Sequence, residues 1–184
     1  MNHSLTSRAF LAAGFGAAFA GAAHADCAAV IAAYTKADAT HRFALFEVDS
    51  LAEAPKGDPL IVNIGQASFT QEYVRKGPLQ FVKGGYRKGG YAEGSEAGSL
   101  KSREQKHEVR CEPLGERKIG TEPAIGYQIR SDSAANQADP TAIHLWVSRS
   151  SGLPIFHGMG SDGGGFRWVF GPGVTEPVPG KTGK

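Results

Sequence analysis

Two histidines and an aspartate in the last third of the chain have the residue types of a transition-metal site. His144 and His157 stand on either side of a turn sequence, residues 150–152, and Asp162 follows closely. If the flanking segments are paired strands, the two imidazoles lie nearly opposite each other and, with a carboxylate, could hold Zn or Mn. The alternative is two half-buried histidines that hydrogen-bond locally. The absence of a known ligand motif with this spacing favours that alternative.

The sequence carries no recognisable enzyme motif. It has no Gly-x-Ser-x-Gly elbow, no His-Glu-x-x-His and no Walker loop. The basic, glycine-rich run from Gly84 to Gly90 could cradle an anion, yet it lacks the strand-to-helix context of a phosphate loop, which favours a solvated turn. We therefore expect no catalytic residue and a protein that is not an enzyme.

Eight aromatic residues are candidates for lining an apolar cavity. Aromatic side chains on strands are mostly buried in a core, and some of this set could instead line a pocket. The eight are Phe43, Phe46, Phe69, Tyr73, Tyr127, Trp146, Phe156 and Trp168. A cavity lined by them would accept a hydrophobic or acyl ligand.

Residues 1–25 have the pattern of a cleavable signal peptide. Arg8 precedes an apolar run that ends in Ala23-His24-Ala25, a small-x-small cleavage site. The run is too short, and too rich in Gly and Ala, for a membrane span. Asp26 before Cys27 argues against a lipid anchor. We expect a periplasmic protein, or one secreted beyond the outer membrane, with no transmembrane anchor after cleavage.

Composition limits the partners and the redox state. Removal of the signal peptide leaves 19 basic against 18 acidic residues, which disfavours a nucleic-acid binder. Cys27 and Cys111 are the two cysteines. In an oxidising compartment they are expected to form a disulfide, and a thiol pair on a metal is the alternative.

Periodicity predicts one helix followed by a series of strands. Residues 27–40 have helical spacing, and from Arg42 the period changes to two. Residues 77–99 are rich in glycine and are expected to form either short edge strands or a mobile flap. Residues 143–148 and 153–159 form the clearest hairpin, in which Val147 or Ser148 lies near Leu153 or Pro154.

This order of elements predicts an α+β fold, a curved antiparallel sheet packed on an N-terminal helix. We expect residues 1–25 to be the signal peptide, residues 26–172 to form a single domain and residues 173–184 to be a flexible tail.

The late hairpin resembles the end of LolA-like proteins, the periplasmic lipoprotein-carrier family. The resemblance rests on Tyr127-Gln128-Ile129, on His144-Leu145-Trp146-Val147-Ser148, and on Ser151-Gly152-Leu153-Pro154-Ile155. It implies an open half-barrel with helices over its concave face and an apolar cavity between them. These are fold motifs, and they carry no catalytic residue.

Three functions are consistent with the sequence. The leading hypothesis is a non-enzymatic periplasmic binding protein that holds a hydrophobic ligand or a lipoprotein between sheet and helix. The second is a secreted protein that scavenges Zn or Mn through His144, His157 and nearby acids. The third is a module that docks on another envelope or secreted protein through residues 77–99.

Overall fold

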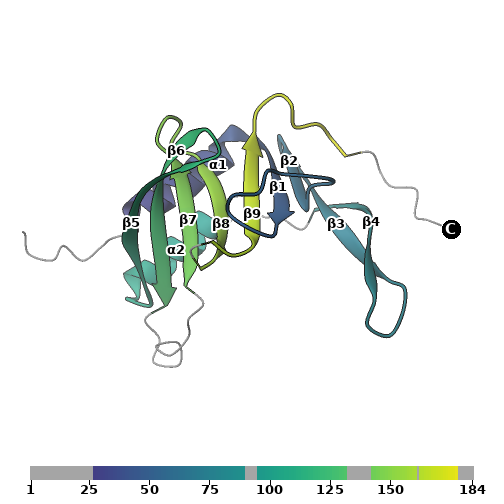
Figure 1. Ribbon diagram of the computed structural model, residues 1–184, viewed down its shortest axis with the longest axis horizontal. Helices are drawn as coiled ribbons and strands as arrows, with labels where there is room; N and C mark the ends of the chain where they lie inside the picture. The colour runs from purple at the N-terminus through teal and green to yellow at the C-terminus, as the bar shows by residue number, and fades with distance from the viewer. Residues whose placement is uncertain (1–26, 90–94, 132–141, 161, 178–184) are drawn as a thin grey trace, which may run out of the picture.

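The computed structural model describes residues 27–89, 95–131, 142–160 and 162–177. The expected signal peptide, residues 1–25, lies outside them. Within these ranges the elements are α1 (Ala28–Thr40), β1 (Arg42–Val48), β2 (Ile61–Ile64), β3 (Ala67–Arg75), β4 (Phe81–Lys88), α2 (Ser95–Gln105), β5 (Val109–Ile119), β6 (Glu122–Ser131), β7 (Ile143–Ser148), β8 (Pro154–Met159) and β9 (Gly165–Phe170) (Figure 1).

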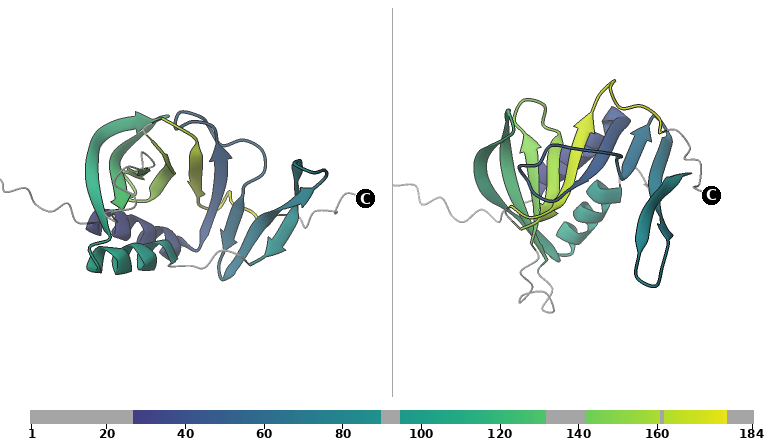
Figure 2. Two further views of the ribbon diagram at one scale, coloured as in Figure 1. Left: turned by 90° about the horizontal axis from the view of Figure 1, so that it is seen from below. Right: turned by 45° about the vertical axis from the view of Figure 1, so that its right-hand side comes forward.

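The nine strands form one sheet in the order β4-β3-β2-β1-β9-β8-β7-β6-β5, and all neighbours pair antiparallel. The sheet curls around α1 and α2, which cover its concave side, while β3 and β4 extend away from the body (Figure 2). The fold is therefore α+β with a curved antiparallel sheet, as the sequence predicted. Neither helix in the described ranges has the length and apolarity to cross a membrane.

The helix α1 is anchored by one buried face. Its sequence is rich in alanine, a strong helix former, and Val30, Ala33, Tyr34 and Ala37 recur at helical spacing and are buried. These side chains pack with Phe43, Leu145 and Trp168 of the sheet in a cluster that we call the inner core. A disulfide between Cys27 and Cys111 ties the start of α1 to β5, with Cα atoms 5.0 Å apart, which confirms the expected pairing.

The glycine-rich segment, for which the sequence suggested short edge strands or a flap, contains one edge strand and the start of a second helix. Residues 81–88 form β4, and α2 follows, with Ala97 and Leu100 buried in the inner core. The helix was missed because Gly98 has low helix propensity and only two buried apolar residues mark its inner face. The expectation of a single helix is therefore wrong.

Candidate functional site

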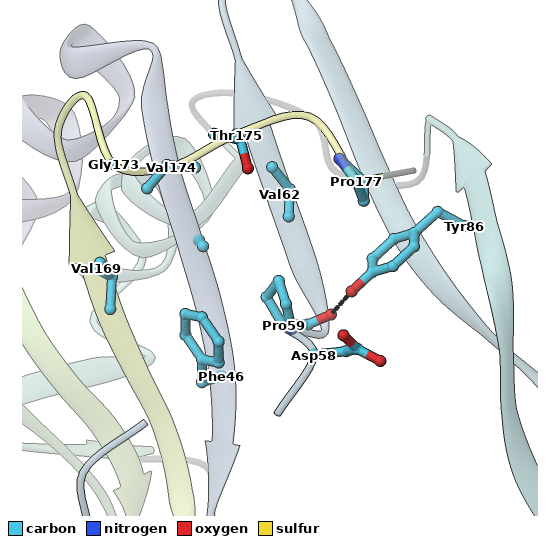
Figure 3. A pocket seen from close by; sticks show the side chains of 11 residues that line it. Phe46, Asp58, Pro59, Val62, Tyr86, Val169, Gly173, Val174, Thr175 and Pro177 are labelled. Carbon is cyan, nitrogen blue, oxygen red and sulfur yellow. Dashed lines mark hydrogen bonds between the residues drawn. The ribbon is translucent and has the colours of Figure 1, made fainter. Parts of the chain in front are cut away.

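The described residues form a pocket on the face of the sheet opposite the helices. Side chains alternate along β1, so Phe43 and Leu45 enter the inner core while Ala44 and Phe46 point to the other face. The pocket, which we call the outer pocket, has a volume of about 260 Å³. It is lined by Ala44, Phe46, Asp58, Pro59, Val62, Tyr86, Val169, Gly173, Val174, Thr175 and Pro177 (Figure 3).

Tyr86 and the loop before β2 form one wall. The Tyr86 hydroxyl donates a hydrogen bond to the Pro59 carbonyl oxygen at 2.5 Å, which holds the ring against the loop (Figure 3). Burial, with a smaller contribution from the Asp58 carboxylate, raises the pKa of Tyr86 to about 12. The phenol therefore stays neutral at physiological pH. Asp58 is the charged side chain in the lining, and it is exposed.

The segment after β9 closes the pocket from above. Val174 is only 6% exposed and packs in one cluster with Ala44 and Val62. A turn fixes it, because the Val174 amide donates to the Gly171 carbonyl oxygen at 3.1 Å. Burial of a valine side chain contributes about 1.5–3 kcal/mol. Part of the expected flexible tail, residues 173–177, therefore runs along the sheet with Val174 packed on it, and residues 178–184 lie outside the described residues.

The eight aromatic residues proposed as one cavity lining are divided among separate places. The inner core contains Phe43, Tyr127 and Trp168. A second cluster, on the outer face, contains Trp146 and Phe156. The cluster beside the outer pocket contains Phe46 and Phe69, and Tyr73 is 47% exposed.

The single-cavity prediction is wrong because adjacent strand positions point to opposite faces. Among the eight, Phe46 is the residue that lines the outer pocket. The prediction also missed Val62, Tyr86 and Val169. The signal that could have separated the two faces is the alternation within β1, in which both sets of positions are apolar.

The predicted pairing of the late hairpin holds only next to the turn. Val147 pairs with Pro154, as expected, but the next pair is Trp146 with Phe156. Ile155 is therefore an extra residue in β8, a β-bulge. From there on the register is shifted by one, so that His144 lies opposite Gly158 and Leu145 lies opposite His157.

This shift sends the two histidines to opposite faces of the sheet. His157 faces α1, where its Nδ1 lies 3.3 Å from the Tyr34 hydroxyl, and His144 is buried on the outer face. Asp162 accepts a hydrogen bond from Arg117 Nη1 at 2.9 Å. The described residues contain no group of three metal-ligating side chains. The described residues therefore do not bring the three predicted ligands together, and His157 contacts Tyr34, far away in the sequence, instead.

No protein-family model and no curated protein sequence matches this chain. A solved structure, titled "Crystal structure of MucB", is similar with a TM-score of 0.36 and 15% sequence identity, over 78% of this chain. The chain spans 58% of the length of that MucB chain.

Proposed function

We propose that this protein is a non-enzymatic binding protein of the bacterial envelope that holds an apolar group in the outer pocket. The pocket itself is the observation that carries the proposal. Most of its lining residues are aliphatic or aromatic, and polar atoms supply a substantial share of the exposed surface, a mixture that suits a ligand with both an apolar and a polar part. The apolar group would be an acyl chain, free or as part of a lipoprotein.

The location differs from the cleft that the resemblance suggested. The space between the helices and the sheet is occupied by the inner core, in which Phe43 and Leu145 are fully buried. A ligand placed there would have to displace these side chains. The outer pocket needs no such displacement, and its volume of about 260 Å³ suits one end of an acyl chain or one large apolar side chain.

Placement in the envelope is supported by two features. Residues 1–25 have the signal-peptide pattern. The disulfide between Cys27 and Cys111 suits an oxidising compartment, because cytosolic proteins seldom keep such bonds. Fractionation of cells that express the full chain tests this part. We expect the processed protein in the periplasmic fraction or the medium, and an unprocessed protein in the cytosol would contradict it.

A pocket-filling variant tests the binding site. Gly173 lines the pocket, and a Cβ atom there would meet no other atom within 4 Å, so Gly173→Trp can add a ring at the pocket without backbone strain. Titration with a fluorescent acyl probe should give binding to the wild type and clearly weaker binding to this variant. Gly98→Trp is the matched control, because Gly98 is exposed on α2 and also has open space around it.

Two outcomes would count against the site. The first is that the wild type takes up no acyl probe and yields no co-purified lipid in native mass spectrometry. The second is that Gly173→Trp binds the probe as tightly as Gly98→Trp.

The hairpin of β3 and β4 favours protein docking as a second candidate function. Leu79 is 94% exposed and Phe81 is 60% exposed, and the hairpin projects from the body of the molecule (Figure 1). Exposed apolar residues gathered in one place are typical of interaction sites. Residues 73–83 carry three basic side chains and no acidic one, so the partner would be an acidic envelope or secreted protein.

A double variant tests this docking surface. We expect the wild type to retain an acidic partner from an envelope extract and Leu79→Ser/Phe81→Ser to lose it. Leu114→Ser is the control, because Leu114 is an exposed apolar residue on β5, at the opposite edge of the sheet. Equal retention by all three proteins would argue against the hairpin as the docking surface.

A further inference from the structure

Arg167 lies beside the outer pocket, on the same face of the sheet. In the centre of the sheet it pairs with Phe46 on β1 and with Phe156 on β8. Val169 follows two residues later on β9 and therefore points to the same face. Because Phe46 and Val169 both line the outer pocket, the arginine stands next to that wall.

The guanidinium of Arg167 is partly buried, and two of its three nitrogen atoms lack a partner in the described part of the chain. Its Nε and Nη1 atoms are shielded from solvent and have no hydrogen-bond partner among the residues that the structure describes. Burial alone lowers the pKa of Arg167 from its usual value, but a guanidinium remains charged at neutral pH. By contrast, the exposed Arg117 and Arg149 have carboxylate partners at 2.9 and 2.8 Å.

A charged group whose shielded N–H donors lack partners destabilises a protein unless something compensates them. A carboxylate or phosphate is the natural complement, because its oxygen atoms accept strong, charge-assisted hydrogen bonds from a guanidinium. The apolar pocket beside Arg167 supplies a place for the rest of such a molecule. Asp58 lies next to Tyr86, across the pocket from Val169, so an anionic group is repelled from that side (Figure 3).

We propose that Arg167 binds the anionic head group of an amphipathic ligand whose apolar chain lies in the outer pocket. This inference rests on the proposed function and narrows the ligand class to acyl carboxylates and alkyl phosphates. The head group would lie on the Phe46 and Val169 side of the pocket, and the chain would extend toward Val62 and Tyr86.

Three probes with one chain length test the head group in the wild-type protein. Dodecanoate, dodecyl phosphate and dodecanol are titrated below their micelle concentrations. We expect at least one anionic probe to bind about tenfold or more tightly than the alcohol, as expected for hydrogen bonds to a charged group. The dissociation constants of dodecanoate and dodecyl phosphate show whether a carboxylate or a phosphate is preferred. Inorganic phosphate is added as a competitor that has no chain.

Two substitutions connect the preference to Arg167. In Arg167→Met the anionic probes should bind no more tightly than dodecanol, while dodecanol binding is unchanged. Arg167→Lys should keep part of the preference, because it keeps the charge but loses the guanidinium N–H donors. An equal affinity for all three probes in the wild type, or a preference that survives in Arg167→Met, would overturn the head-group inference and leave the pocket in place. No binding of dodecanol or of the anions would instead contradict the proposed function.

Thermal unfolding without ligand gives a readout that does not depend on binding. Removal of a charge whose shielded donors are unpaired should leave the melting temperature of Arg167→Met equal to that of the wild type or raise it. A lower melting temperature would mean that the guanidinium has a stabilising partner in the free protein, which would overturn the inference. Dodecanoate should raise the melting temperature of the wild type more than that of Arg167→Met.

Discussion

The hydroxyl group of Tyr34 on α1 lies 3.3 Å from Nδ1 of His157 on β8, so a polar contact crosses the inner core. The rings of these two residues are 6.3 Å apart at their centroids and meet edge to face. Burial raises the pKa of Tyr34, and burial lowers the pKa of His157. Both side chains are therefore neutral when the protein is folded at neutral pH.

This contact predicts that the protein loses stability in mild acid. The pKa of His157 is lower in the folded state than in the unfolded state, where it is about 6.5. Below about pH 6.5 the unfolded chain binds more protons than the folded protein. The free energy of unfolding therefore decreases as the pH is lowered, until the folded-state pKa is reached. The slope for one such group is at most about 1.4 kcal/mol per pH unit. Urea unfolding at a series of pH values between 7 and 5 measures it.

The His157→Gln variant should have a shallower dependence of stability on pH than the wild type. His144 adds to the remaining slope, because burial and then the nearby charge of Arg130 lower its pKa, against a smaller opposing effect of Asp162. The control is His107→Asn, which changes an exposed histidine in a left-handed conformation that asparagine tolerates. A slope in His157→Gln equal to that of the wild type would contradict the assignment.

Reduction of the disulfide should destabilise the protein strongly. Cys27 and Cys111 are 84 residues apart in sequence, so the bond closes a long loop in the unfolded chain. The loop-entropy model gives about 3–5 kcal/mol for such a loop. We expect denaturant unfolding with a reducing agent, or of the Cys27→Ala/Cys111→Ala variant, to show a loss of this size. A loss below about 1 kcal/mol would mean that packing alone holds α1 on β5.

Gly126 should not tolerate a side chain. It pairs with Trp146 across β6 and β7, and a Cβ atom there would lie 2.7 Å from two carbons of the indole ring. The ring has little room to move, because Trp146 is buried in one cluster with Val48 and Phe156. We expect Gly126→Ala to cost about 1–3 kcal/mol.

Chemical denaturation followed by tryptophan fluorescence measures this cost. Gly98→Ala in α2 is the control, since it has open space and should gain about 0.5–1 kcal/mol from helix propensity. Equal stability of the two variants would show that Trp146 is free to move.

Zinc and manganese should not bind through the two late histidines. His144 and His157 lie on opposite faces, and Asp162 is paired with Arg117. Calorimetric titration of either metal should therefore give the same result for the wild type and for His144→Ala. Heat that is present in the wild type and absent in the variant would mean that the hairpin can rearrange into a metal site.

The sequence determined the features that depend on local patterns. The alternating segments predicted β1 and the hairpin of β7 and β8, and the turn chemistry placed Val147 or Ser148 near Leu153 or Pro154, which includes the observed pair of Val147 and Pro154. The count of two cysteines, together with the expected export, predicted the Cys27–Cys111 bond. These predictions succeeded because each depends on residues that are close in the sequence or on the oxidation of two cysteines to a disulfide.

Tertiary structure decided which side chains meet. One extra residue, Ile155, shifts the register of the hairpin and separates His144 from His157, and periodicity in the sequence gives no sign of it. Val174 is buried only because Ala44 and Val62, distant in sequence, offer an apolar surface to pack on. The place of Arg167 beside the outer pocket likewise follows from the pairing of β9 with β1. Contacts between distant segments depend on register and burial, and these are set when the whole sheet forms.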